Sequence, residues 1–266
     1  MEIITINQKQ ELLKHKAKIN NLFSACFGGR EIGDLWEWAY IKNPNNDPII
    51  SLCYENDDLV GHYAIISLPL RSGTNVINTY LSMTTMIAES YRKYGLFHKL
   101  ADSAYEVASK NGVDFVIGFP NKASAPGFKK RLNWVFPSPD YVVRVTKKKL
   151  LENKNLSLLL LKNTYTLNLH DKNTLKWRMS RPGAEYFWNE GLLYKHFDGA
   201  IDILYLETID DLKKIPDCKF INILIQNENM QLRDFMIFEY QFGGVRINKD
   251  FDPVNINRQM CLSDVF

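Results

Sequence analysis

Tyr91-Arg-Lys-Tyr-Gly-Leu-Phe97 joins a strand-like run to an amphipathic helical pattern, and this junction decides the fold. The run before it, Tyr80-Leu-Ser-Met-Thr-Thr-Met-Ile87, is apolar and threonine-rich, as a buried strand requires. After it, apolar residues recur at helical spacing at Leu96, Leu100, Ala104 and Ala108. A glycine turn that opens a helix directs main-chain N–H groups and the positive end of the helix dipole at one point. The sequence Arg92-x-x-Gly95 therefore predicts a phosphate-binding turn.

The segments that follow repeat the strand-and-helix alternation. A second apolar run, Val113–Phe119, leads to Asn121, a short helical pattern from Ala123, and the pair Asn133-Trp134. Strand, R-x-x-G turn, helix, strand, Asn and helix in this order resemble the core of the GCN5-related N-acetyltransferases (GNAT). The motifs that carry this resemblance lie between Leu59 and Val145.

The resemblance implies an acyl-CoA site. In the family, the turn carries the pyrophosphate of coenzyme A and two diverging strands admit its pantetheine arm. A main-chain N–H at the divergence, here near Thr85, holds the thioester oxygen. The implied cofactor-binding residues are Met86, Ile87, Arg92, Lys93, Tyr94, Gly95, Leu96, Phe97, Asn121 and Phe128.

The sequence departs from the family pattern at four places. Phe97 stands where a small residue usually completes the turn, and Asn133-Trp134 replaces a Gly-Phe pair. Phe128 falls near the place of the tyrosine that serves as general acid, so that acid is missing. The carboxylate that some members carry on the central strand would fall near Leu81, which is apolar.

The general base therefore has to be another group. His62 is the first candidate, because a hairpin centred near Gly73 would place it opposite about Thr84, and a neutral imidazole suits proton removal near pH 7. A histidine satisfied within the sheet is an equally good interpretation. The alternatives are Glu89, a terminal carboxylate of Phe266, and a water chain.

Composition excludes several classes of protein. The net charge of +3 is small and the lysines are scattered apart from Lys147-Lys-Lys149, so nucleic-acid binding has little support. No apolar run reaches the length of a membrane span, and Met1–Thr5 lacks the features of a signal peptide. The four cysteines and five histidines form no metal-ligand spacing, so we expect no metal and a cytoplasmic protein with reduced thiols.

The expected fold is α/β: a GNAT-like mixed, mostly antiparallel sheet flanked by helices, with a second, smaller and degenerate GNAT-like α/β lobe. We expect an acyl-CoA-binding domain over 1–146, in which Tyr141–Val145 finishes the sheet, a connecting segment over 147–174, and an acceptor lobe over 175–266. The second lobe lacks an R-x-x-G turn of its own.

The acceptor is predicted from arginine and aromatic residues. Trp177-Arg-Met-Ser-Arg-Pro182, ahead of a half-domain, resembles two-lobed acetyltransferases of surface-polysaccharide pathways that act on nucleotide-linked amino sugars. Arg178 and Arg181 would then bind a diphosphate, since guanidinium groups bind phosphate bidentately. The remaining acceptor-binding candidates are Trp36, Tyr40 and Tyr186. The structural alternative for the two arginines is that they form surface salt bridges. The alternative for the aromatic segment around Trp36 and Tyr40 is that it packs onto the sheet.

These features predict transfer of an acyl group from acyl-CoA to a primary amine, with a dTDP- or UDP-linked amino sugar as acceptor. Two alternatives stay open: a GNAT-like protein that only binds acyl-CoA or a partner, and a peptide or protein N-acyltransferase. The sequence leaves open the acyl chain, the amine and the oligomeric state, a homo-oligomer included.

Overall fold

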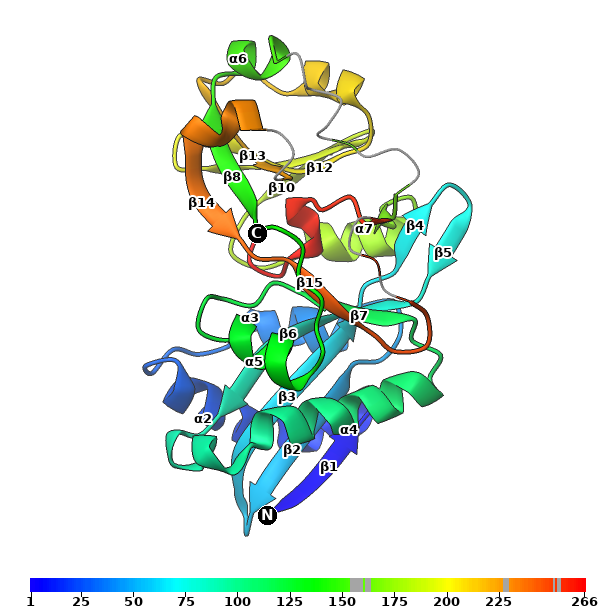
Figure 1. Ribbon diagram of the computed structural model, residues 1–266, viewed down its shortest axis with the longest axis vertical. Helices are drawn as coiled ribbons and strands as arrows, with labels where there is room; N and C mark the ends of the chain where they lie inside the picture. Colours follow the sequence, from blue (N-terminus) through cyan, green and yellow to red (C-terminus); the bar gives the residue numbers. More distant parts are fainter. Residues whose placement is uncertain (154–159, 161–163, 227–229, 251, 253–254) are drawn as a thin grey trace.

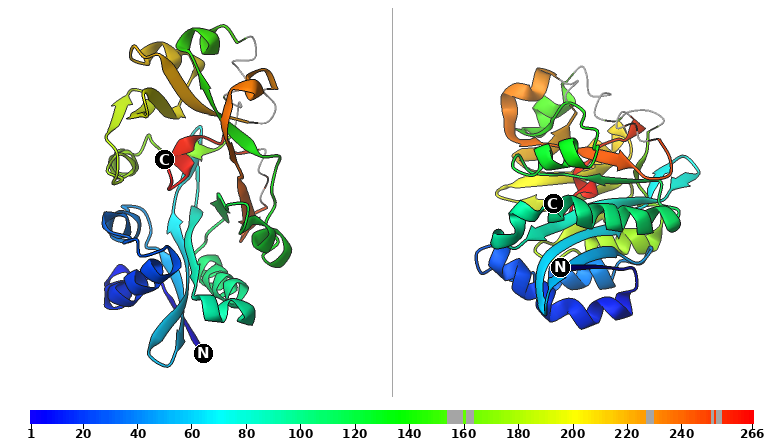
Figure 2. Two further views of the ribbon diagram at one scale, coloured as in Figure 1. Left: turned by 90° about the vertical axis from the view of Figure 1, so that its left-hand side faces the viewer. Right: turned by 60° about the horizontal axis from the view of Figure 1, so that its bottom comes forward.

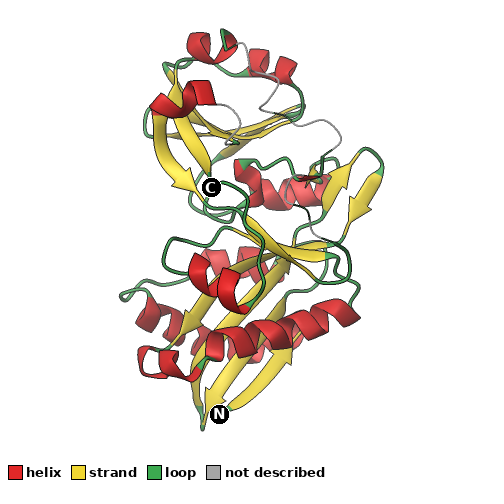
Figure 3. Cartoon of the chain, viewed as in Figure 1, coloured by secondary structure: helices red, strands yellow, loops and turns green. Residues whose placement is uncertain are grey.

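Two six-stranded sheets, one in each lobe, organise the chain (Figures 1 and 3). The computed structural model describes residues 1–153, 160, 164–226, 230–250, 252 and 255–266. Residue 266 lies between the two lobes, whereas residue 1 lies at the far end of the first lobe (Figure 1). The predicted α/β fold with a mostly antiparallel sheet and a second lobe is confirmed.

The first sheet has the order β1-β2-β3-β6-β7-β15, and only its β6–β7 pair is parallel. Its strands are β1 (Glu2–Ile6), β2 (Ile49–Glu55), β3 (Asp58–Ser67), β6 (Thr79–Ile87), β7 (Phe115–Gly118) and β15 (Gly243–Arg246). Helix α4 (Leu96–Lys110) covers one face and α2 (Lys16–Cys26) the other (Figure 2). Alternate residues of β3 therefore enter different cores: Tyr63 packs on the α4 side and Ala64 on the α2 side.

Short elements complete this lobe. They are α1 (Lys9–Leu12), the 3-10 turns η1 (Leu13–His15) and η3 (Glu89–Tyr94), α3 (Asp34–Trp36), the π-helical turn η2 (Glu37–Ile41), the hairpin β4 (Leu70–Ser72) and β5 (Asn75–Ile77), and α5 (Ala125–Arg131). The turn at Gly73, the predicted centre of a hairpin, joins β4 to β5.

The second sheet has the order β10-β11-β12-β13-β8-β14, with β12 and β13 parallel. Its strands are β10 (Tyr186–Asn189), β11 (Leu192–Phe197), β12 (Ala200–Leu206), β13 (Phe220–Ile225), β8 (Asp140–Val145) and β14 (Met236–Tyr240). The other elements here are α6 (Lys147–Leu151), β9 (Thr166–Leu167), α7 (Lys172–Met179), and the 3-10 turns η5 (Ile209–Lys214), η6 (Met230–Phe235) and η8 (Met260–Leu262). Part of the predicted connecting segment 147–174 lies outside the described residues.

One strand lies in a different sheet from the one predicted, so the predicted composition of the first sheet is corrected. Tyr141–Val145 was expected in the first sheet, but β8 lies between β13 and β14 in the second. The last strand of the first sheet is instead β15, which pairs with β7. A boundary at residue 146 therefore does not separate the two sheets. β14 and β15 follow each other closely in the chain and yet enter different sheets.

Two tryptophans join the lobes face to face. The rings of Trp38 in η2 and Trp177 in α7 stack with centroids 4.7 Å apart and planes 6° apart. Each indole N–H also donates to the main-chain oxygen of the other residue, at 2.9 and 2.8 Å. Both side chains are buried, so the pair holds α7 against the aromatic segment of the first lobe.

Within the part of the chain that the structure describes, we find no helix with the length and apolar character needed to cross a membrane.

Gly243 must be a glycine because the ring of Phe136 occupies the place of a side chain. A Cβ atom at Gly243 would lie 2.5 Å from Phe136 Cε1. We predict that Gly243→Ala lowers the free energy of unfolding by about 1–3 kcal/mol, the usual cost of overpacking. Phe136→Leu in the same chain should restore part of the loss. Urea denaturation measures both, and an unchanged stability of the single variant would contradict the account.

Candidate active site

The two parallel strands of the first sheet diverge and leave a cavity between them. Pairing of β6 with β7 ends at Ser82 and Gly118, although β6 continues to Ile87. A cavity of about 360 Å³ begins there. It is lined by Phe27, Ser82, Met83, Thr84, Thr85, Gly118, Phe119, Pro120, Asn121, Ser124, Phe128, Trp134, Asp264 and Val265. Residues distant in sequence thus meet where the strands part.

A β-bulge in β6 faces this cavity. His62 pairs with Met86 and Ala64 with Met83, so Thr84 and Thr85 together oppose the single residue Tyr63. Thr84 has a φ of 52°, which is unusual for a residue with a branched side chain. A bulge leaves main-chain groups without ladder partners, and here those groups lie at the cavity wall.

His62 supports the bulge from the opposite side. Its Nδ1 lies 2.7 Å from the Thr84 carbonyl oxygen, which can only accept, so Nδ1 carries the hydrogen. The side chain is fully buried, and burial lowers the pKa of His62 to about 4. Its Nε2 has no hydrogen-bond partner among the described residues, and His62 does not line the cavity. The register also differs from the expected one, since His62 faces Met86 rather than Thr84.

The predicted phosphate turn lies at the start of α4. Gly95 has a φ of 69° and directly precedes the helix, so the glycine is needed for its left-handed conformation. Arg92, Lys93 and Tyr94 are exposed, whereas Leu96 is buried against the sheet. Met86 and Ile87 end the strand that leads into the turn, with Met86 buried and Ile87 partly buried. The alternative base Glu89 is exposed in η3.

Two aromatic rings, those of Phe128 and Trp134, line the cavity, and Phe97 packs behind Phe128. Phe128 contacts Phe97 and Trp134, with centroids 4.9 and 4.5 Å apart. Trp134 donates from Nε1 to the Tyr105 hydroxyl at 2.9 Å, and Gly118 lacks a side chain where the Trp134 ring lies. Phe97 and Phe128 therefore have packing roles here. Nearby, Asn121 Oδ1 accepts hydrogen bonds from Ala123 N and Ser124 N and shapes the turn before α5.

Arg178 and Arg181, the predicted ligands of the diphosphate, both donate hydrogen bonds to main-chain oxygens near residue 266. Arg178 is 1% exposed and donates to the main-chain oxygens of Cys261, Ser263 and Phe266, at 3.0, 3.3 and 2.6 Å. Arg181 donates to the oxygens of Asp264 and Val265 at 2.6 and 3.2 Å. The two guanidinium groups together fix the segment 261–266.

That segment brings a carboxyl group to the cavity. Asp264 is partly buried and lines the cavity together with Thr84 and Thr85. Burial raises the pKa of the Asp264 carboxyl, against the opposing effects of its own main-chain N–H and of the charges of Arg181 and Arg178. Sequence reasoning missed Asp264, because nothing in the local pattern of Leu262–Phe266 marks it as catalytic. Phe266, whose terminal carboxylate was one of the alternative bases, does not line the cavity.

The aromatic acceptor candidates lie inside the protein. Trp36 and Tyr40 are both fully buried, and their rings meet edge to face at 5.9 Å. Tyr186 is buried too, its hydroxyl accepting from Arg181 at 3.3 Å and its ring 5.5 Å from the Arg178 guanidinium carbon. None of the three lines the cavity. They support the walls around it.

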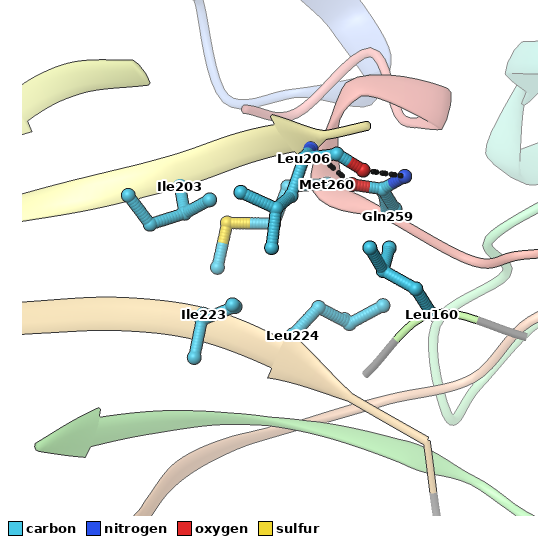
Figure 4. A pocket seen from close by; sticks show the side chains of 7 residues that line it. All are labelled: Leu160, Ile203, Leu206, Ile223, Leu224, Gln259 and Met260. Atoms are coloured by element: carbon cyan, nitrogen blue, oxygen red, sulfur yellow. Dashed lines mark hydrogen bonds between the residues drawn. The ribbon is translucent and has the colours of Figure 1, made fainter. Parts of the chain in front are cut away.

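A second-lobe cavity of about 10 Å³ is too small for a substrate (Figure 4). It lies among Leu160, Ile203, Leu206, Ile223, Leu224, Gln259 and Met260. Gln259 bonds to both main-chain groups of Leu206, at 2.6 and 3.2 Å, which completes the end of β12. Among the described residues, no group of three or more His, Cys, Asp or Glu side chains is placed to hold a metal ion.

A comparison with protein families finds a match for the part of the chain that contains the divergent strands and the glycine turn. The family model described as an acetyltransferase (GNAT) domain matches residues 13–136. The match is to this part of the chain and not to the whole of it. This match supports an N-acyltransferase. The matched residues include the bulge, the Gly95 turn and the cavity wall apart from Asp264 and Val265, but neither β15 nor the segment 261–266.

Several solved structures resemble this chain over both of its lobes. A GCN5-related N-acetyltransferase from Kribbella flavida has a TM-score of 0.61 and 9% identity, over 93% of this chain and 72% of that chain. One from Anabaena variabilis has a TM-score of 0.60 and 10% identity, over 93% and 73%. Eis1 from Mycobacterium abscessus has a TM-score of 0.59 and 8% identity, over 93% and 74%. At these identities the fold alone is shared. No curated protein sequence matches the chain significantly.

A substitution of Arg178 tests how the segment 261–266 is held in place. Arg178→Met would leave three main-chain oxygens without their donor, so we predict a loss of about 3 kcal/mol in unfolding free energy. Amide hydrogen exchange over 261–266 should become faster. Arg181→Met, at a partly exposed site, should cost less. Equal stability of Arg178→Met and the unmodified protein would contradict this role.

Proposed function

We propose that the chain is an acyl-CoA-dependent N-acyltransferase whose active site is the cavity between β6 and β7. The observation that carries the proposal is that one cavity contains the diverging strands, the Thr84 bulge and the Asp264 carboxyl. Acyl transfer to an amine needs these three things: a place for the acyl group, a donor for the oxyanion and a proton acceptor.

The residues of the turn fit acyl-CoA. Gly95 lets the chain enter α4 with free N–H groups at the helix start, and Arg92 and Lys93 beside it are exposed cations. Asn121 and Phe128 line the cavity in which the thioester arm would lie. Acyl-CoA supplies the activated acyl group as a thioester.

The bulge is suited to hold the oxyanion. A main-chain group of Thr84 or Thr85 that the sheet does not use can donate into the cavity, and such a donor costs no reorganisation during the reaction. His62 acts here as a positioning residue, because its Nδ1 hydrogen fixes the Thr84 carbonyl and so the orientation of the bulge.

Asp264 is the general base in this proposal. It lines the cavity, and because its pKa is raised, that pKa lies closer to the pH at which a general base works efficiently. His62 is less suitable, since it is buried outside the cavity and weakly basic. Phe128 offers no proton, so the departing thiolate would be protonated by solvent rather than by a tyrosine.

A nucleotide-linked amino sugar remains a candidate acceptor on the resemblance alone. The arginines chosen for its diphosphate are engaged with main-chain oxygens of 261–266, so they lend it no further support. A panel of dTDP- and UDP-amino sugars, simple amines and peptides, assayed by thiol release from acetyl-CoA, decides between the acceptor classes. If CoA binds and no amine releases thiol, the protein only binds acyl-CoA.

Gly95→Asp tests the phosphate turn. We predict that it abolishes CoA binding in calorimetry, because a carboxylate would stand where N–H groups meet the pyrophosphate. Gly95→Asn is the matched control, since asparagine tolerates the left-handed conformation and has the same size without the charge. It should retain most of the affinity. Equal CoA affinity of Gly95→Asp and the unmodified protein would remove the turn from the mechanism.

Asp264→Asn tests the base. We predict a fall in kcat of roughly 10²–10⁴-fold, the range for loss of a general base. A base works deprotonated, so the rate of the unmodified protein should rise with pH through the raised pKa of Asp264, and this limb should vanish in the variant. His62→Phe should keep the limb, because an imidazole with a pKa of about 4 is already neutral. The reverse pattern would make His62 the base.

A further inference from the structure

A second cavity adjoins the proposed active site. Its volume is about 500 Å³, and it lies between the loop after β7 and the edge strand β14. It shares Phe119, Pro120, Asn121 and Val265 with the first cavity, so these residues form a common wall. A molecule in the second cavity therefore lies next to the acyl-transfer site.

The walls of this cavity are largely aromatic. The rings of Phe119 and Tyr240 stack with centroids 4.8 Å apart, and Phe238 lies 5.3 Å from Tyr240. Phe238 is 48% exposed and Val265 is 60% exposed, although both are large apolar side chains. Apolar surface gathered in a concave site is typical of a ligand pocket.

The polar groups at this site are one ion pair and one neighbouring carboxyl group. Glu239 and Lys122 both line the cavity and pair with each other at 3.7 Å, and the carboxyl of Asp264 lies in the adjoining cavity. The Tyr240 hydroxyl is already used in a hydrogen bond to Ser263 Oγ. An apolar molecule with a protonated amine would find the aromatic lining here and a counter-charge at Asp264 beside it.

Resting on the proposed function, we propose that the second cavity binds the apolar body of the acceptor, an aryl or alkyl amine whose nitrogen points past Val265 toward Asp264. Phe238 is then a specificity-determining residue. The protonated amine gives one proton to Asp264, and its nitrogen then attacks the thioester carbon. The amide bond forms as the carbon–sulfur bond breaks, and coenzyme A leaves as a thiolate that takes up the second proton of the amine through solvent.

Two amines and two variants test the proposal. Thiol release from acetyl-CoA is measured with 2-phenylethylamine and with ethylamine. Phe238→Ala should raise the KM for 2-phenylethylamine by about tenfold or more, the effect of losing an aromatic contact, with the KM for ethylamine and acetyl-CoA unchanged. Ile237→Ala is the matched control, because Ile237 is 53% exposed on the same strand but does not line the cavity. It should change neither amine.

Binding measured without turnover separates this proposal from the proposed function. Calorimetry should detect 2-phenylethylamine binding to the unmodified protein and about tenfold weaker binding to Phe238→Ala. If that holds while no amine releases thiol, the pocket stands and the acyltransferase proposal falls. The pocket assignment is overturned if Phe238→Ala affects both amines equally, if 2-phenylethylamine does not bind, or if Phe238→Ala instead alters the preference for octanoyl-CoA over acetyl-CoA.

Discussion

The site depends on the hydrogen bonds that the buried guanidinium group of Arg178 donates to the segment 261–266. This group is withdrawn from water, which lowers its pKa, and in exchange it donates to three main-chain oxygens of the segment 261–266. Charge-assisted hydrogen bonds of this kind contribute about 1.5–3 kcal/mol each. The neighbouring Trp177 stacks on Trp38 of the first lobe. Adjacent residues of α7 thus hold the first lobe on one side and the segment that carries Asp264 on the other.

The chain passes between the two lobes more than once. β14 and β15 follow each other in the chain with Gln241 and Phe242 between them, yet they belong to different sheets. β8 lies between β13 and β14 in the second sheet. The short strands β4 and β9 also pair with each other across the lobes. The cavity between β6 and β7 and the cavity beside β14 share a wall, which would bring an acceptor close to an acyl donor.

The sequence predicted what local pattern encodes. The strand before Ile87, the turn at Gly95 and the helix after it were all visible, because periodicity and glycine placement act over a few residues. The roles of Arg178 and Arg181 were not, because their partners lie 83 to 88 residues away along the chain. An arginine that binds main-chain oxygens has the same sequence signature as one that binds phosphate.

Asp264 and His62 also show what a local sequence pattern cannot predict. His62 was noticed because a histidine near a strand divergence suggests a base, but only the three-dimensional packing shows that it is buried and directed at the Thr84 carbonyl. Asp264 lies in a segment without periodicity, and its position depends on contacts with α7. Local pattern thus predicts the strand, turn and helix around Gly95, whereas the surroundings of His62 and Asp264 depend on residues far away in the chain.

A crystal structure of the protein with coenzyme A tests the central claim most directly. The account predicts the sulfur atom within the cavity between β6 and β7, beside the Thr84 bulge, with the Asp264 carboxyl facing the sulfur across the cavity and Arg178 still bound to 261–266. Coenzyme A bound elsewhere, or a segment 261–266 displaced so that Asp264 faces away from the sulfur, would contradict it.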